Sequence, residues 1–275
     1  MAQLPEYLKP KRPLNSAMLR SLRRWFPPTL QGAEHLDPER PALFVGNHTT
    51  YGMIDIPLMQ AEIYNASGIW LRGMTDHLHY RLPPWARFLE RQGAFRGTRE
   101  LCHQAMERGD NILLFPGGGR EVMKRQGEEY TLIWKQRLGF VRLASQHGYP
   151  IQPFASVGAD DVWDILWDAG HWQRGRLKPL LKRLPLWDLA KQGEEIPPLV
   201  RGIGLSAVPR PEPFYFLLGE PISTESYQGL ENDDDAMMAL RDQIAEAVRG
   251  LIEEGQQLRD GAAKGSMLRR LLNKS

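Results

Sequence analysis

The chain has 275 residues, with 35 lysines and arginines against 33 acidic residues and a formal net charge of +2. This length predicts one sizeable α/β core, and the balanced charge gives no indication of nucleic-acid binding. The single cysteine, Cys102, excludes an intrachain disulfide and is typical of a reducing compartment. No apolar run approaches the roughly 20 residues that span a bilayer, and no signal-peptide core is present. We therefore expect a cytoplasmic protein, at most peripherally associated with the inner face of a membrane.

The two ends of the chain are basic. Residues 1–30 predict an amphipathic segment, in which Asn15 or Ser16 caps a short helix that runs to Trp25. Its arginines and apolar side chains suit either an anionic membrane surface or packing on a sheet. Residues 31–260 are predicted to form a single domain, and residues 261–275 a basic tail that is a further candidate for membrane contact.

The chain is organised around residues 41–59, where a reactive side chain follows a buried strand. The apolar run 42–45 predicts the strand, His48 follows its end, and Asp55 opens a predicted helix over 56–64. A histidine at the carboxyl end of such a strand is where an open α/β sheet places reacting groups. A neutral imidazole there can take a proton from a hydroxyl, and a nearby carboxylate can orient it.

Two interpretations of this pair stay open on this stretch alone. His48 and Asp55 are either a catalytic pair or a structural histidine and a helix cap. The chain contains no G-x-S-x-G nucleophile elbow, which favours direct attack by a substrate alcohol.

A second stretch, residues 111–121, has the same pattern of an apolar strand followed by polar residues. An apolar strand breaks at Pro116 and is followed by three glycines, Arg120 and Glu121. Backbone N–H groups of a glycine turn and a guanidinium can hold an anion or a developing oxyanion. The alternative is a plain glycine turn with a solvated arginine.

The remaining elements are predicted from periodicity and capping residues. Asp76, His77 and His79 have no third ligand at zinc-type spacing, so we predict no metal site. Residues 82–91 predict a loop that leads into a helical turn, and Thr98 caps a helix over 100–108. Further helices are predicted over 130–147 and 233–258, and strands over 69–72, 150–158, 199–208 and 214–218. Asp160 and Asp161 follow the strand at 150–158 and either line the site or cap a turn.

Residues 162–189 combine tryptophans with basic residues and leucines. Tryptophan beside cations suits the bilayer interface, where the rings lie at headgroup level. Stacking on nucleic acid would use the same residues, but the low net charge and the leucines favour lipid. An insertion packed on the sheet is the structural alternative.

Two motifs resemble the lysophospholipid and glycerolipid acyltransferase superfamily. They are Asn47 and His48 followed by Asp55, and F-P-G-G-G-R-E at 115–121. The second run is most similar to the branch of type-two diacylglycerol and monoacylglycerol acyltransferases, with plant phytyl-ester and bacterial relatives. The resemblance runs from about residue 42 to 161, with a looser tail to about 222. Residues 98–100, T-R-E, and the strand P-I-Q-P-F are similar to further family blocks.

The resemblance implies a single α/β domain with a mostly parallel central sheet flanked by helices. It implies an O-acyltransferase that moves a fatty acyl group from acyl-CoA or acyl carrier protein to a lipid hydroxyl, without a cofactor. His48 would be the general base and Asp55 its partner. The substrate would be held by Gly117, Gly118 and Arg120, with Arg96, Arg99 and Glu121 as further contacts.

Two departures from the family pattern concern the partner of His48 and the class of acceptor. Six residues separate His48 from Asp55, more than is usual, so Gly52 absorbs the extra length or Asp55 is not the partner. Phosphate-accepting members usually carry F-P-E-G-T-R, whereas this chain has Gly117 and Gly119 at the two differing positions. This favours a glyceride or long-chain alcohol as acceptor. The alternatives are a lysophosphatidate or lysophospholipid acyltransferase, a thioester or ester hydrolase using the same pair, and a non-catalytic lipid-binding protein.

Overall fold

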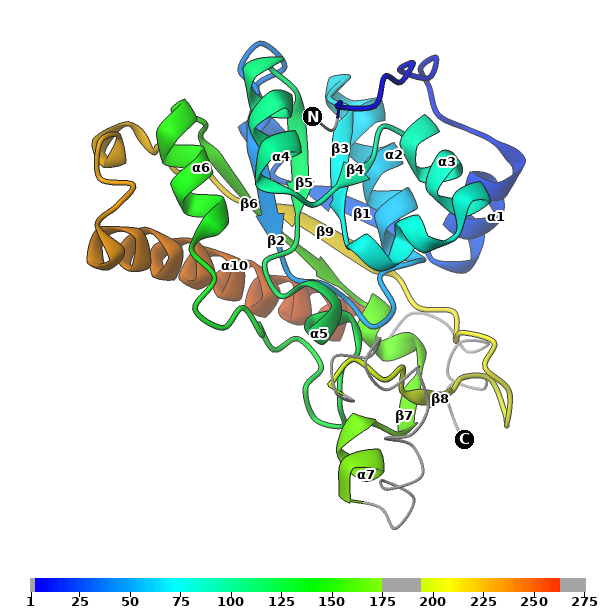
Figure 1. Ribbon diagram of the computed structural model, residues 1–275. Coiled ribbons are helices and arrows are strands. Elements are labelled where there is room, and N and C mark those ends of the chain that lie inside the picture. Colours follow the sequence, from blue (N-terminus) through cyan, green and yellow to red (C-terminus); the bar gives the residue numbers. More distant parts are fainter. Residues whose placement is uncertain (1–2, 175–193, 263–275) are drawn as a thin grey trace.

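A computed structural model describes residues 3–174 and 194–262 of the chain. It shows a mixed α/β fold built on a seven-stranded sheet in the order β1-β9-β6-β2-β5-β3-β4, with a separate pair β7-β8 (Figure 1). The strands are β1 Pro28–Gln31, β2 Leu43–Gly46, β3 Leu71–Thr75, β4 Phe95–Arg96, β5 Asn111–Leu114, β6 Ile151–Val157, β7 Asp164–Trp167, β8 Leu199–Arg201 and β9 Phe214–Leu218. All neighbours in the large sheet are parallel except β6 and β9. The predicted α/β class with a mostly parallel sheet is confirmed.

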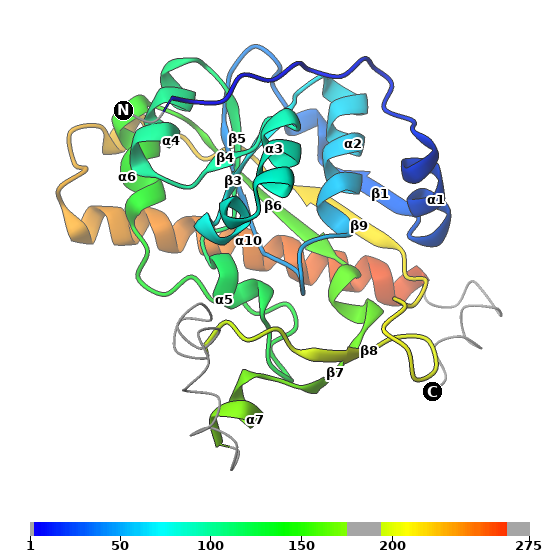
Figure 2. The ribbon, with the colours of Figure 1, turned by 45° about the vertical axis from the view of Figure 1, so that its right-hand side comes forward.

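Helices cover both faces of this sheet. They are α1 Ala17–Trp25, α2 Asp55–Ser67, α3 Pro83–Arg91, α4 Arg99–Glu107, α5 Gly118–Val122, α6 Gly139–His147, α7 Ala169–Arg174 and α10 Asp234–Ala262, with 3-10 turns η1 Ala33–His35, η2 His77–Arg81, η3 Ala159–Val162 and η4 Glu225–Tyr227. Apolar side chains of α4, α6 and α10 form one core with the sheet, and those of α1 and α2 form the other. Figures 1 and 2 show these two groups on opposite sides of the strands.

The alternation of side chains along the strands explains the two cores. On β2, Leu43 and Val45 point to the core with α4, α6 and α10, whereas Phe44 points to the core with α2. The central strands β2 and β6 are buried at every position, as parallel strands between helix layers are. The carboxyl ends of β2, β5 and β6 meet at one edge, where α5 and the β7-β8 pair also lie (Figure 2).

Several boundaries differ from the sequence predictions. The helix predicted over 130–147 begins only at Gly139, because Tyr130 and Lys135 have positive φ angles of 61° and 50°. Residues 83–91 form a full helix, α3, with Pro83 in its first turn. The late strand predicted over 199–208 is limited to β8.

The N-terminal segment contributes to the main domain. Leu4 and Phe26 are buried in the two cores, and β1 pairs with β9. Ser16 caps α1 by accepting from the backbone N–H of Leu19 at 3.3 Å, as one of the two predicted caps. No helix among residues 3–174 and 194–262 is long and apolar enough to cross a membrane. The predicted basic tail lies almost wholly outside the described residues.

The long helix α10 approaches the sheet closely at one glycine, which gives a test of the fold. A Cβ at Gly255 would lie 2.7 Å from Cγ2 of Val157 and 2.9 Å from Cδ1 of Leu217, both buried. We expect Gly255→Ala to destabilise the chain by about 1–2 kcal/mol in chemical denaturation, because overpacking outweighs the gain in helix propensity. Gly250→Ala on the same helix is the matched control, since a Cβ there meets nothing within 4 Å. The control should gain about 0.5–1 kcal/mol, and equal gains for both variants would contradict the close contact.

Candidate active site

The loop that carries His48 is pinned directly after β2. The side chain of Asn47 bonds the backbone of Ser156 on β6 twice, donating to its carbonyl at 2.9 Å and accepting from its N–H at 2.8 Å. Asn47 thus continues the β2-β6 ladder by one residue. A Cβ at Gly46 would lie 2.5 Å from the Phe154 ring, so only glycine lets β2 end in this way.

The imidazole of His48 lies between an aromatic ring and a glycine. It stacks on Phe115, with ring centroids 4.0 Å apart and an interplanar angle of 23°. On its other side, Gly52 has a φ of 54°, and a Cβ there would lie 2.1 Å from Cε1 of His48. The loop can fold over the ring only because residue 52 has no side chain.

Asp55 lies at the start of α2 and is buried. Its Oδ2 accepts a hydrogen bond from Oγ of Ser156 at 2.8 Å. Among the described residues, neither Oδ1 of Asp55 nor Nδ1 of His48 has a hydrogen-bond partner, although both atoms are buried. A carboxylate oxygen and an imidazole N–H are complementary, but their predicted pairing stays a prediction. Burial raises the pKa of Asp55, against the hydrogen bond from Ser156.

The F-P-G-G-G-R-E segment contributes a buried carboxylate to the same place. Oε1 of Glu121 accepts from the backbone N–H of His48 at 2.9 Å, so α5 holds the histidine loop directly. A Cβ at Gly117 would lie 1.7 Å from Oε2 of Glu121. Gly117 is therefore needed to make room for this carboxylate. Burial raises the pKa of Glu121 to about 7, while the charge of Lys124 acts in the opposite direction.

A buried ion pair completes this group. Nζ of Lys124 lies 3.4 Å from Oδ2 of Asp160, and both side chains are fully buried. Asp160 also accepts from the N–H and hydroxyl of Thr50, at 2.7 and 2.9 Å, and from the N–H of Tyr130 at 3.0 Å. The pair therefore fixes the loop two residues beyond His48.

These surroundings keep His48 neutral. Its pKa falls to about 3, first because burial disfavours the imidazolium and then because of the charges of Lys124 and His79. At neutral pH the ring is therefore an unprotonated base. Among residues 3–174 and 194–262, no group of three or more His, Cys, Asp or Glu side chains is placed to hold a metal ion.

The predicted arginines lie in three different settings. Arg120 is buried and already engaged, since it donates to Oε1 of Glu128 at 2.5 Å. Arg96 is exposed on β4 with its guanidinium 4.7 Å above the ring of Tyr80, and Arg99 is exposed at the start of α4. Because β5 and β3 lie between β2 and β4, the fold separates Arg96 and Arg99 from His48. Their contact with substrate stays a prediction.

The sequence reasoning missed the supporting residues. Lys124 belongs to no recognisable motif. A lysine shortly after Arg120 is typical of a solvated surface. Ser156 lies within a strand that is buried at every position, where a small polar residue gives no hint of a partner. The sequence predicts that Asp160 either lines the site or caps a turn. In the structure it accepts from the N–H of Thr50 and so holds the loop of His48.

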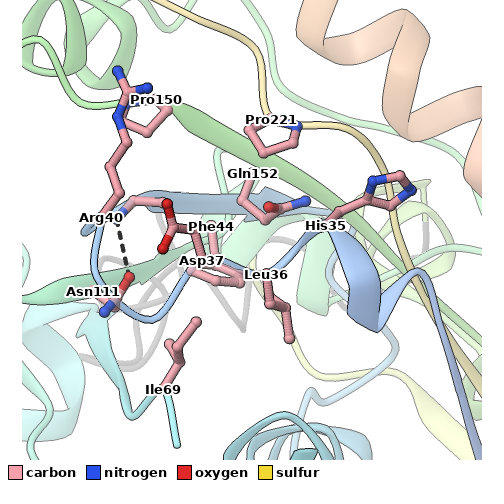
Figure 3. Close-up of a pocket in the computed structure, with 11 residues that line it drawn as sticks. His35, Leu36, Asp37, Arg40, Phe44, Ile69, Asn111, Pro150, Gln152 and Pro221 are labelled. Carbon is pink, nitrogen blue, oxygen red and sulfur yellow. Dashed lines mark hydrogen bonds between the residues drawn. The ribbon is translucent and has the colours of Figure 1, made fainter. Parts of the chain in front are cut away.

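A cavity of about 120 Å³ lies at the opposite edge of the sheet, where β2, β5 and β6 begin (Figure 3). Its polar side chains are engaged in the fold: Asn111 accepts from the N–H of Ala42 at 3.0 Å, and Arg40 pairs with Glu225 at 2.9 Å. The cavity is small beside ligand pockets of roughly 300–1,000 Å³. We therefore place the candidate active site at His48.

A neutral imidazole, a buried carboxylate and a glycine turn lie together at the carboxyl edge of the parallel strands, an arrangement compatible with group transfer. A family model described as Acyltransferase matches residues 28–157, which include His48, Asp55 and the glycine segment. The match covers just under half of the chain, so the chain is similar to acyltransferases over this region.

The relatives act on different lipids. The chain is 27% identical over 225 residues to phytyl ester synthase 1, chloroplastic, from Arabidopsis thaliana, covering 75% of this chain and 31% of the relative. It is 30% identical over 129 residues to the human DGAT1/2-independent enzyme synthesizing storage lipids, covering 47% of this chain and 39% of the relative. The chain thus spans about a third of the length of these two relatives. A solved structure, the 1-acyl-sn-glycerophosphate acyltransferase PlsC from Thermotoga maritima, matches with a TM-score of 0.49 and 14% identity, covering 86% of this chain and 78% of that one.

The buried carboxyl of Glu121 predicts a pH-dependent stability. Because its pKa in the folded chain is about 7, above the ordinary 4.5, the folded chain retains a proton that the unfolded chain releases between these values. Stability from this group is therefore present below about pH 4.5 and is lost as the pH rises through 7. Glu121→Gln keeps an acceptor oxygen for His48 and removes the titration. We expect the variant to exceed the wild type by about 2–3 kcal/mol at pH 8 and to match it near pH 4.

Urea unfolding at a series of pH values measures this difference. The depressed pKa of His48 acts in the opposite direction, but His48 is present in both proteins and drops out of the comparison. Glu253→Gln, exposed on α10, is the control and should show no such dependence. A constant difference between Glu121→Gln and wild type at all pH values would show that folding does not shift the pKa of Glu121.

Proposed function

We propose that the chain is an acyltransferase that moves a fatty acyl group from acyl-CoA or acyl carrier protein to a lipid hydroxyl, with His48 as general base. The observation that carries this proposal is a neutral imidazole held between Phe115 and Gly52, surrounded by buried polar atoms that lack partners among the described residues. Such atoms indicate a site built to receive another molecule. The match of residues 28–157 to the Acyltransferase family model supports the same reaction class.

The chemistry needs two proton movements. A ring nitrogen of His48 takes the proton of the acceptor hydroxyl as its oxygen attacks the thioester carbonyl carbon. The tetrahedral intermediate then collapses, the C–S bond breaks, and the leaving thiolate receives the proton back from His48. Oδ1 of Asp55 is suited to accept from Nδ1 of the imidazolium, which leaves Nε2 for the substrate.

The acceptor is proposed to be uncharged, a glyceride or long-chain alcohol. Two contacts support this choice. The carboxylate of Glu121 fills the space that a side chain at residue 117 would enter, so a glutamate like that of the F-P-E-G-T-R members does not fit there. The guanidinium of Arg120 is paired with Glu128, so its charge is partly neutralised before any phosphate arrives. The donor thioester and the acceptor lipid are both proposed to be reached from the inner face of a membrane.

The direct test is transfer of a labelled acyl group from acyl-CoA, and from acyl carrier protein, to glyceride, fatty-alcohol and lysophosphatidate acceptors. We expect a labelled neutral ester, and a loss of about 10²–10⁴-fold in kcat/KM for His48→Ala. His103→Ala, a histidine on α4 outside the site, should retain the activity.

Each of the other possible results of this assay would identify one of the alternative functions. Free fatty acid formed equally with and without alcohol would identify a hydrolase that activates water. Faster acylation of lysophosphatidate than of any neutral acceptor would overturn the acceptor class. Binding of lipid without turnover, on both donors, would indicate a non-catalytic protein.

The glycine that faces His48 provides a second test. Gly52→Ala places a methyl group where the imidazole lies, so we expect the ring to be displaced and kcat/KM to fall by about 10²-fold. Gly109→Ala is the matched control, because Gly109 also has a positive φ, of 76°, but a Cβ there meets nothing within 4 Å. Both variants should lose about 1 kcal/mol of stability from backbone strain. Equal activities for the two variants would show that Gly52 does not position the ring.

A further inference from the structure

The segment from His77 to Arg91 exposes large apolar side chains that the fold does not use. The exposed fractions are 39% for Leu78, 66% for Leu82, 39% for Trp85 and 49% for Phe88. We call these four side chains, with Arg81, Arg87 and Arg91, the η2–α3 surface. Figure 2 shows α3 in front of the sheet with no other element drawn over it.

The sequence of α3 gives it more apolar side chains than its packing uses. Ala86 is the one buried residue of this nine-residue helix. Leu82, Trp85 and Phe88 recur at three-residue spacing along one side of this segment, and all three are exposed. The rings of Trp85 and Phe88 stack on each other with centroids 5.3 Å apart. The two rings therefore form one apolar surface feature.

The same segment has a net positive charge. Its fifteen residues contain three arginines and one acidic residue, Glu90, a net charge of +2 that equals the formal net charge of the whole chain. Arg87 and Arg91 lie one turn apart on α3, and Arg91 follows Phe88 by three residues, so cations flank the apolar stripe. All three arginines are exposed.

One residue of η2 connects this segment to the candidate active site. Nε1 of Trp85 donates to Nδ1 of His79 at 3.1 Å. The charge of His79 is in turn one of those that lower the pKa of His48.

We propose that the η2–α3 surface docks the chain on an anionic bilayer, with the leucines and the aromatic pair among the lipid chains and the arginines on headgroup phosphates. This rests on the proposed function, whose acceptor is a lipid. A bilayer suits the surface better than a protein partner does, because four side chains fall short of the roughly 1,000 Å² that a stable protein interface buries. Aromatic side chains beside cations are the combination that binds the bilayer interface.

Vesicle flotation of the full chain tests this without any assay of turnover. The probes are vesicles of phosphatidylcholine alone and of phosphatidylcholine with one third phosphatidylglycerol. We expect wild-type binding to the anionic vesicles, and a loss of about tenfold or more for Trp85→Ser/Phe88→Ser and for Arg87→Gln/Arg91→Gln. Leu205→Ser, at a side chain 96% exposed outside this surface, is the matched control and should bind as wild type.

A second measurement separates docking from chemistry. With a short-chain acyl-CoA and a water-soluble alcohol, the surface variants should keep the kcat of the wild type, so a failure of the proposed reaction would not be mistaken for a failure of docking. Unchanged thermal unfolding would show that the exposed substitutions leave the fold intact.

Three results would overturn the proposal. One is vesicle binding that survives both double variants but is lost in Leu166→Ser, because Leu166 is 44% exposed on β7 within the other predicted membrane segment. Another is a dimer in solution that Trp85→Ser/Phe88→Ser dissociates. The third is binding of an acidic acyl carrier protein at this surface with no vesicle binding.

Discussion

Side chains, rather than strand pairing, hold the backbone that presents His48. After β2 ends, Asn47 bonds β6, Glu121 accepts from the N–H of His48, and Asp160 accepts from Thr50. Each bond satisfies a backbone group that the end of the strand leaves without a ladder partner. Since the three anchors come from β6, α5 and η3, the loop can adopt this conformation only when the sheet and the glycine segment are both in place.

This arrangement has an electrostatic cost that the protein offsets locally. Two carboxylates, Glu121 and Asp160, are taken out of water, and Lys124 is the cation that lies among them. A buried pair of this kind adds little net stability, but removing one partner costs about 3–5 kcal/mol. The same burial depresses the pKa of His48, which keeps it neutral and makes its protonated form expensive. A base in such a setting needs a counter-charge when it takes a proton. Among the described residues, Asp55 and Glu121 each have a buried carboxyl oxygen without a hydrogen-bond partner, and Asp55 is the partner predicted from the sequence.

The sequence predicted the fold class because buried parallel strands and amphipathic helices leave strong periodic patterns. The strand before His48, the helix after it and the Thr98 cap all lie where the patterns placed them, within a few residues. The first half of the helix predicted over 130–147 was wrong, because apolar residues such as Trp134 are buried there at irregular spacing around the site. Lys124 and Ser156 were not predicted, since their roles depend on partners distant in sequence. Residues 175–189 of the predicted surface at 162–189 lie outside the described residues.

The three glycines of residues 117–119 have a different structural role from the one that the sequence suggested. From sequence, the three glycines suggested bare N–H groups for an anion. In the structure, Gly117 makes room for the carboxylate of Glu121, and Gly119 faces the carboxylate of Glu195, whose Cδ would lie 2.7 Å from an added Cβ. Two of the glycines are therefore required by the packing of acidic side chains, which lower the attraction of this turn for a phosphate. This arrangement supports the proposed uncharged acceptor, and the support comes from the space occupied at residue 117 rather than from a missing arginine.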